Sequence, residues 1–323
     1  MNTIERHTAP LSEVLRIDLT EFWSNIFQTS FAELQIVLVG GEVGQNVDTI
    51  WIAREGATIT ATCHLTVSRL NPRIGGLGEI ATAPQSRGKG LAAQLVERAI
   101  VAATASGCTQ LVLGTVNKTA ARLYAKFGFR YLPGTRVMLR NADGTEGLGS
   151  APFDRRDIKI VAGAPCHRLT IIPPILTATD HAILDANVEL IATRLADQTS
   201  CMGLYPRYER LAKKGGQWFV AQASNGLTIG IASVIGVTSG IAQVDGFVVP
   251  KVGADVLASL FQAAILWGEA MGFAIQSVCG VDDLNKRAVI VAQDSGYEET
   301  ALLTIAGHPV PILRFSPKLD RLR

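Results

Sequence analysis

The residues best placed to do chemistry lie just after Pro84, where two glycines alternate with two cations. The order is Gln85, Ser86, Arg87, Gly88, Lys89, Gly90, Leu91 and Ala92. Apolar residues recur at helical spacing after this stretch, so we expect a helix to begin here. The first N–H groups of a helix have no internal partners, and the helix dipole is positive at that end, which together favour an anion. The stretch therefore predicts a phosphate-binding turn.

The elements on either side position this turn. Residues Leu77–Ala83 are mostly apolar and predict a strand, which Pro84 ends by removing a ladder donor. The turn differs from two other phosphate loops, because it lacks the Gly-Lys-Thr/Ser ending of a nucleoside triphosphate loop and the Gly-x-Gly-x-x-Gly of a dinucleotide fold. A plain surface turn before an amphipathic helix is the alternative interpretation of these residues.

A second segment follows a predicted strand at Gln110–Thr115. It contains Asn117, Ala120, Leu123, Tyr124, Lys126, Gly128 and Phe129. Asn117 or Thr119 can cap the start of a helix, an apolar face includes Tyr124, and Gly128 ends it. Alone, this pattern predicts a helix packed on a sheet, with Tyr124 as a core or interface aromatic residue.

Together the two segments resemble the GCN5-related N-acetyltransferases, the GNAT family. The pattern Gln85-x-x-Gly88-x-Gly90 is similar to the family's pyrophosphate signature, and the helix from Asn117 to Phe129 is similar to its second motif. The resemblance implies that acetyl-CoA, or another acyl-CoA, is the co-substrate and that no metal is needed. It assigns cofactor binding to the residues Ile80, Ala81, Thr82, Gln85, Arg87, Gly88, Lys89, Gly90, Leu91, Ala92, Asn117 and Tyr124.

The resemblance also implies how these residues divide the work. Strands of this fold splay apart near Ile80, Ala81 and Thr82, which would free backbone N–H groups for the acyl and pantetheine arm. Backbone N–H groups from Arg87 to Ala92 would hold the pyrophosphate, with charge added by Arg87 and Lys89. Tyr124 would lie near the sulfur and act as the general acid.

Amide formation also needs a base, because an acceptor amine is protonated near neutral pH. Glu79 is the candidate, acting through water from the acceptor side of the predicted splay. A solvated or salt-bridged side chain is the alternative for Glu79. His64, on the preceding strand, could serve as the base instead, although an isolated histidine is more often structural.

The acceptor itself is not specified by these motifs. Glu21, Trp23 and the loop Gly40-Gly41-Glu42 are candidate contributors on position alone. We expect a primary amine of a small metabolite or amino acid. Acylation of a protein amine, transfer that depends on aminoacyl-tRNA, and a non-catalytic acyl-CoA-binding scaffold are the alternatives.

The periodicity of the first half predicts an α/β (α+β) fold. A strand near residues 4–8, a helix over 14–27 and a hairpin of 49–53 with 58–67 precede the strand and helix around the phosphate turn. Strands near 111, 129–131 and 136–139 complete the order β-α-(α)-β-β-β-α-β-α-β-β. This order matches a GNAT domain over residues 1–142, with a mixed, mostly antiparallel sheet flanked by helices.

The second half repeats the first in weaker form. Residues 143–157 have lost periodicity and predict a linker, and 158–323 predict a second GNAT-like domain. Val244–Pro250 parallels Gly78–Pro84, with an acid five positions before each proline, and Asn285–Tyr297 parallels the second motif. The turn Lys251–Asp255 is shorter, has a single glycine and places a carboxylate at the helix start, and Ala292 replaces Tyr124. These losses predict a degenerate copy without an acyl-CoA site.

Composition limits the classes of protein. The chain has 323 residues, 48% of them hydrophobic, and a net charge of +2, so nucleic-acid binding is not indicated by charge. Five widely spaced cysteines favour buried thiols in a reducing compartment. The polar start lacks a signal sequence, and the apolar stretch Leu227–Val249 contains Gln243 and Asp245, which favours strands over a membrane span. We expect a cytoplasmic protein with no membrane partner, as a monomer or homodimer.

Overall fold

The computed structural model describes residues 2–142, 147–149, 153–177, 184–190, 201–238, 240–249, 252–273, 275–279, 297–305 and 308–315. The chain divides into two compact units. The first comprises Met1–Ser150, Pro165–Thr170 and Ser200–Met202, and the second comprises Ala151–Ala164, Ile171–Thr199 and Gly203–Arg323. The predicted second domain comprised residues 158–323. Two short segments of this range, Pro165–Thr170 and Ser200–Met202, belong to the first unit instead.

The sheet of the first unit has seven strands in the order β1-β2-β3-β4-β5-β7-β6. Their bounds are β1 Thr3–Thr8, β2 Asn46–Glu55, β3 Thr58–Ser68, β4 Ile74–Thr82, β5 Gln110–Gly114, β6 Arg130–Tyr131 and β7 Val137–Asn141. All neighbours are antiparallel except β4 and β5, which are parallel. The predicted fold class and element order of this unit are confirmed.

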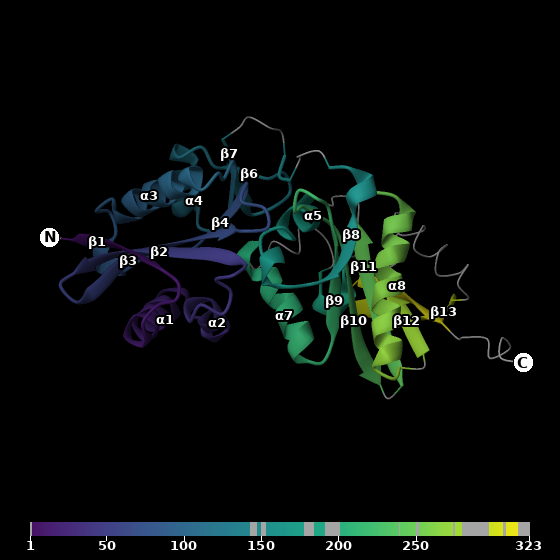
Figure 1. Cartoon of the computed structure of the whole chain (residues 1–323). Coiled ribbons are helices and arrows are strands. Elements are labelled where there is room, and N and C mark those ends of the chain that lie inside the picture. The colour runs from purple at the N-terminus through teal and green to yellow at the C-terminus, as the bar shows by residue number, and fades with distance from the viewer. Residues whose placement is uncertain are drawn as a thin grey trace, which may run out of the picture. The chain divides into compact units, whose positions relative to one another are not determined.

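Helices cover both faces of this sheet (Figure 1). They are α1 Glu13–Phe27, α2 Gln35–Leu38, α3 Leu91–Ala105 and α4 Lys118–Lys126. Side chains of a strand alternate between the two faces, so Trp51 and Ala53 pack with α3 and α4 while Ile50 and Ile52 pack with α1 and α2. Strand β4, which carries the predicted site, lies between these two hydrophobic clusters, with Leu77 in one and Ala81 in the other.

Two segments from later in the chain pack on the first unit. A Cβ atom placed on Gly76 of β4 would meet the side chains of Leu169 and Met202, so these side chains lie against the strand. Leu169 is fully buried. Within the predicted linker, Gly147 and Gly149 are held to the first unit by both polar atoms of the Gln110 side chain, each at 2.9 Å.

The sheet of the second unit has the order β13-β14-β12-β11-β10-β9-β8. Its strands are β8 Lys159–Ala162, β9 Gln217–Gln222, β10 Thr228–Thr238, β11 Ile241–Val248, β12 Ile275–Cys279, β13 Tyr297–Ile305 and β14 His308–Phe315. Again one pair, β11 with β12, is parallel and the others are antiparallel. Read from β8, the order is β8-β9-β10-β11-β12-β14-β13, so each strand of the second sheet has the same neighbours as its counterpart in the first sheet.

The helices of the second unit are α5 Ile172–Thr177, α7 Tyr205–Lys213 and α8 Ala254–Ala270. Helix α8 joins β11 to β12, as α3 joins β4 to β5, and α7 lies on the other side of β9 and β10 (Figure 1). The stretch Leu227–Val249 forms β10 and β11, as its Gly-rich pattern predicted. Among the described helices, none combines the length and the apolar character that crossing a bilayer requires.

Candidate active site

The predicted splay lies between β4 and β5. The two strands pair only from Ile74 to Gly76, against Gln110 to Val112. Beyond Gly76 the residues of β4 keep their pairing with β3, through Ala81 and Thr82, but have no partner in β5. One edge of β4 is therefore open from Leu77 to Thr82, where the sequence placed the acyl-binding residues.

The phosphate-binding turn follows directly. Gly88 and Gly90 adopt φ angles of 77° and 76°, which glycine reaches without strain, and a Cβ atom on Gly88 would meet nothing within 4 Å. Gly90 is the N-cap of α3, and no side chain caps this helix. The first internal bond of the helix runs from the N–H of Gln94 to Gly90, so the preceding N–H groups of the helix stay open to an anion.

The longer polar side chains of this turn are exposed, whereas Ser86 is buried. Lys89 is exposed, as is Arg87, whose Nε donates to the Thr82 carbonyl at 3.3 Å. The backbone N–H of Arg87 donates to the Pro84 carbonyl at 3.3 Å. The backbone donors of the turn therefore begin at Gly88 rather than at Arg87.

Helix α4 packs Tyr124 into the core cluster that also contains Leu77 of β4. The Asn117 side chain caps it by accepting from the N–H groups of Thr119 at 2.9 Å and Ala120 at 3.1 Å, as predicted. Tyr124 is 5% exposed and packs edge-on against Phe129. Burial, with a smaller contribution from Cys63, raises the pKa of Tyr124, so its hydroxyl keeps its proton.

Glu79 occupies an irregular point of β4. The pairing of β3 with β4 shifts between Thr62 and His64, which marks a β-bulge, and Glu79 has a φ angle of 45°. A non-glycine residue in the left-handed region is uncommon, and bulges re-aim side chains next to active sites. Thr62 supports the bulge by donating to the Glu79 carbonyl at 2.7 Å, and Trp23 donates to Thr62 at 2.9 Å.

The Glu79 carboxylate is bound to His64. Glu79 Oε2 lies 2.7 Å from His64 Nδ1, and Asp48 Oδ1 lies 2.9 Å from His64 Nε2. The side chains of His64 and Asp48 are 2% and 3% exposed, whereas that of Glu79 is 16% exposed. Glu79 is thus the accessible end of a buried polar array that begins inside the first unit.

Arg168 completes this array. Its Nη2 lies 2.6 and 2.7 Å from the two carboxylate oxygens of Asp48, and its Nη1 lies 3.3 Å from Glu42 Oε2. Thr66 also donates to Asp48, at 2.7 Å. From the inside outward, the charged groups of this array are Glu42, Arg168, Asp48, His64 and Glu79.

The array fixes the charge of His64. Burial alone would lower the pKa of His64, but hydrogen bonds to Asp48 and Glu79 outweigh it and raise this pKa to about 9. Burial would raise the pKa of Asp48, yet Arg168 and His64 hold it well below its usual range. At neutral pH His64 is therefore an imidazolium that donates to two carboxylates.

The residues predicted at the acceptor side have different positions. Trp23 is fully buried and Glu42 is 3% exposed, so both support the array from within rather than lining a surface. Glu21 is exposed on α1. Sequence reasoning missed Asp48 and Arg168. A carboxylate inside an apolar strand was a signal for Asp48, whereas nothing in the local sequence marks Arg168, which lies 120 positions from Asp48.

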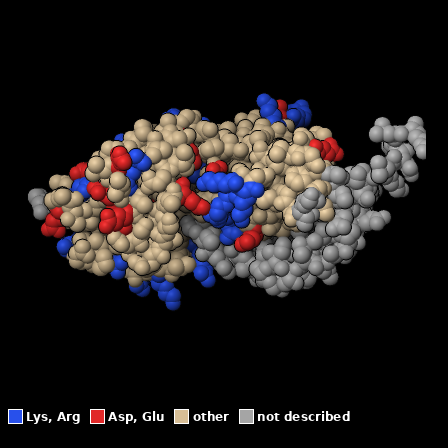
Figure 2. Space-filling model, turned by 90° about the horizontal axis from the view of Figure 1, so that it is seen from below, with Lys and Arg blue, Asp and Glu red and all other residues tan. Residues whose placement is uncertain are grey.

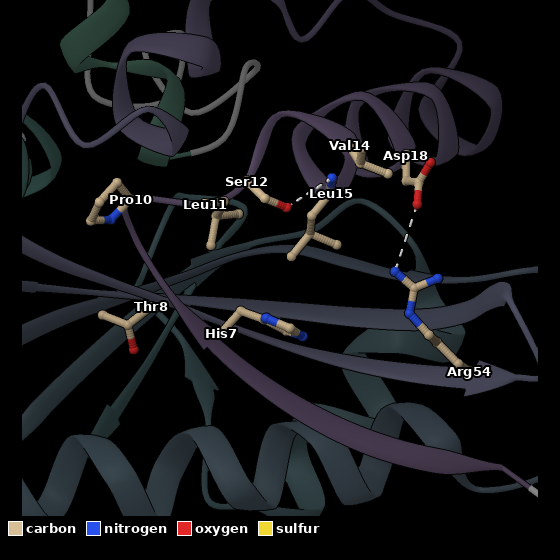
Figure 3. A pocket seen from close by; sticks show the side chains of 9 residues that line it. All are labelled: His7, Thr8, Pro10, Leu11, Ser12, Val14, Leu15, Asp18 and Arg54. Carbon is tan, nitrogen blue, oxygen red and sulfur yellow. Dashed lines mark hydrogen bonds and ion pairs between the residues drawn. The ribbon is translucent and has the colours of Figure 1, made fainter.

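A separate pocket of about 380 Å³ lies between β1 and the start of α1 (Figure 3). Its lining includes His7, Leu11 and Val14, and the ion pair of Asp18 with Arg54, at 3.7 Å, borders it. Neither Glu79, Tyr124 nor the phosphate-binding turn contributes to this lining. The pocket is therefore distinct from the candidate active site.

The second unit differs at the matching positions. Ser233 of β10 lies opposite Asp245 of β11 without a register shift, and Asp245 is 1% exposed. The Asp245 carboxylate accepts the N–H of Ala186 and of Gly246. A short 3-10 turn, Ala186–Val188, thus covers this carboxylate.

The helix start of the second unit is also different. Gly253 is the N-cap of α8 with a φ angle of −75°, and Asp255 in the first turn lies 3.4 Å from Arg155. The predicted counterparts of the second motif, Asn285–Ala288 and Ala292, lie outside the described residues, as does Lys251.

The comparisons with known proteins point to one class. The sequence model of the Acetyltransferase (GNAT) domain matches residues 46–131, which span β2 to β6 and include the whole candidate site except Arg168 and Glu42. This stretch is therefore similar to the Acetyltransferase (GNAT) domain. No curated protein matches the sequence.

Solved structures with a similar fold are remote in sequence. A GNAT-family acetyltransferase from Staphylococcus aureus is 20% identical, covers 44% of this chain and 100% of its own, and has a TM-score of 0.36. A putative acetyltransferase from Salmonella typhimurium with acetyl-CoA is 16% identical, covering 50% and 94%, with a TM-score of 0.40. A phosphinothricin acetyltransferase from Sinorhizobium meliloti, in complex with acetyl-CoA, is 12% identical, covering 49% and 87%, also at 0.40.

Proposed function

We propose that the first unit transfers an acetyl, or other acyl, group from acyl-CoA to a primary amine. The observation that carries this proposal is Glu79. It lies on a bulge at the open edge of β4, with its carboxylate held by a buried imidazolium and its side chain partly exposed. The acyl-CoA site is supported by the uncapped, glycine-rich start of α3 and by the match to the GNAT domain.

The residues divide the chemistry as follows. Backbone N–H groups from Gly88 onward and the cations Arg87 and Lys89 bind the pyrophosphate. The open edge of β4, around Ile80 and Thr82, binds the acyl and pantetheine arm. Exclusion from water at this edge strengthens the hydrogen bonds that polarise the thioester carbonyl.

Glu79 is the general base in this proposal, and His64 is not. Both nitrogens of His64 already donate to carboxylates, and burial removes them from any acceptor. Glu79 accepts a proton from the acceptor ammonium, directly or through water. A protonated amine would be attracted to the accessible Glu79 carboxylate, which favours a cationic acceptor.

Tyr124 is the general acid. Its raised pKa keeps the phenol protonated, and no hydrogen-bond acceptor for its hydroxyl is found among the described residues, which leaves that proton for the departing thiolate. Small metabolites and amino acids are the proposed acceptors, and no residue of the array distinguishes between them.

We further propose that the second unit is a GNAT-like copy without acyl-CoA activity. It shares the strand pairing and the parallel β11–β12 pair, but its carboxylate is covered by Ala186 and its helix start carries Asp255. Such a unit would keep the strand pairing of the first without binding acyl-CoA.

One observation favours a second candidate, transfer that depends on aminoacyl-tRNA. Helix α7 and the residue after it carry three exposed cations, Arg210, Lys213 and Lys214. The view from below shows one cluster of Lys and Arg side chains (Figure 2). RNA binding that falls steeply with salt, and that is lost in a Lys213→Ala/Lys214→Ala protein, would support this candidate.

The test of the main proposal is release of CoA thiol from acetyl-CoA against a panel of primary amines. The panel should include polyamines, single amino acids and a peptide with a free N-terminus, with longer acyl donors run in parallel. We expect amine-dependent release that Glu79→Gln removes. Tight acetyl-CoA binding with no release for any amine would contradict the proposal in favour of a binding scaffold.

A further inference from the structure

We propose that Arg168 is a positioning residue for the reaction of the first unit. Through Asp48 and His64 it holds the Glu79 carboxylate in place. This inference rests on the proposed function for its consequence in catalysis, but the array on which it acts is present without any substrate. Arg168, which follows the predicted linker in the sequence, would thus contribute to the active site of the first unit.

The segment that carries Arg168 is fixed at several points. The Pro165 carbonyl accepts from the Asn46 side chain at 2.8 Å, and the Cys166 N–H donates to Gln45 Oε1 at 2.8 Å. Ser68 donates to the Cys166 carbonyl at 3.1 Å. These bonds attach the segment to the start of β2 and the end of β3, so the guanidinium is delivered to a defined place.

Arg168 lies inside the unit rather than on its surface. It is 4% exposed, and its guanidinium contacts Asp48 and Glu42 on one side and Thr66 at 3.4 Å. A buried carboxylate is costly unless it is paired, and breaking a buried pair is strongly destabilising. Arg168 therefore allows Asp48 to stay ionised next to His64.

The charge of Asp48 in turn decides the state of His64 and Glu79. Asp48 and Glu79 both attract the imidazolium, one at each nitrogen. Among the described residues, Cys63 lies near Glu79 and Tyr124 lies near Cys63, and both are neutral at the relevant pH because burial raises the pKa of each. Loss of Arg168 would remove a cation that contacts Asp48 and Glu42, and the array would take up a proton more readily.

The experiment compares Arg168→Gln with the wild-type chain by two readouts. The first is the titration of the Glu79 carboxyl by ¹³C NMR, assigned with Glu79→Gln, in the absence of substrate. The second is the pH dependence of kcat/KM with acetyl-CoA and the most active amine of the panel. We expect the Glu79 titration and the acid limb of kcat/KM to move upward together by about one pH unit. Acetyl-CoA affinity should stay within about two-fold, since Arg168 is remote from the turn.

Further variants separate charge from folding. The double variant Asp48→Asn/Arg168→Gln removes one charge of each sign, so the balance of the array returns to that of the wild type. In this double variant we expect the Glu79 titration to move back toward the wild-type value. In Arg168→Lys, which keeps the positive charge, we expect the Glu79 titration to stay close to that of the wild type. Arg156→Gln, which alters an exposed arginine paired with Asp154, is the control and should change neither readout.

The outcomes distinguish this inference from the proposed function. An unchanged Glu79 titration in Arg168→Gln, or a double variant no closer to wild type than the single one, would overturn the positioning role. A shifted titration in a protein that acylates no amine would leave the array intact and contradict the proposed function alone.

Discussion

The two units pair their strands alike but differ where β4 and β11 leave their parallel neighbours. In the first unit a bulge turns Glu79 outward, and His64 binds its carboxylate from within. In the second unit the strand is regular at Asp245, Ser233 stands at the position of His64, and the carboxylate is covered by backbone N–H groups. The same strand pairing therefore supports either an accessible carboxylate bound to a buried imidazolium or a buried structural carboxylate.

The largest effect that we expect is on kcat, and it should differ between variants of Glu79 and Asp245. We expect Glu79→Gln to lower kcat by about 10²- to 10⁴-fold, because a general base is lost, while acetyl-CoA affinity stays within about two-fold. Asp245→Asn should lower stability and leave kcat per folded molecule unchanged. Steady-state kinetics and calorimetry on both proteins make the comparison, and equal losses of kcat would remove the distinction between the units.

The next effect concerns stability and pH. The pKa of His64 is raised to about 9 in the folded protein, so the stabilisation from His64 is complete below about pH 6.5 and is lost as the pH rises through 9. We expect wild type to lose about 3 kcal/mol more than His64→Gln over this window. Denaturant unfolding at several pH values measures the difference, and parallel curves for the two proteins would contradict it.

Tyr124 offers a smaller test. We expect Tyr124→Phe to lower kcat by about 100-fold with little change in acetyl-CoA affinity, because only the hydroxyl proton is removed. Tyr208→Phe is the control from the second unit, where the fully buried tyrosine packs on Trp218. A Tyr124→Phe enzyme with the wild-type rate would remove the general-acid role.

The smallest effect is expected at the phosphate-binding turn. The double variant Arg87→Ala/Lys89→Ala should weaken acetyl-CoA binding by about 10-fold, because two charge-assisted contacts are lost while the backbone donors stay. Lys213→Ala/Lys214→Ala makes the same change of charge on the second unit and should leave the affinity unaltered. Calorimetry at two salt concentrations would show whether the cations act at the turn or only through net charge.

The sequence predicted most of the first unit because its signals are local. The glycines at 88 and 90, the cap at Asn117 and the alternation along β2 and β3 each follow from neighbouring residues. The position of Glu79 on a strand was also predictable. Its bulge was not, because a register shift depends on the pairing with β3.

The contacts of the array around His64 could not be predicted from neighbouring residues in the sequence. His64 was considered as a base, whereas its partners Asp48 and Glu79 lie on two neighbouring strands and make it a cation. Arg168 reaches Asp48 only because the chain returns to the first unit after leaving it. Contacts over such separations have no sequence period, so a single sequence contains no pattern that predicts them.

We propose that acyl-CoA binds to the first unit and not to the second. Isothermal titration of acetyl-CoA into the full-length chain tests this binding directly, with Gly90→Val and Gly253→Val as matched variants at the two N-caps. We predict one site per chain, lost in Gly90→Val because the left-handed backbone there excludes a branched side chain, and kept in Gly253→Val, where the φ angle is −75°. Two equivalent sites per chain, or loss of binding in Gly253→Val alone, would contradict the account.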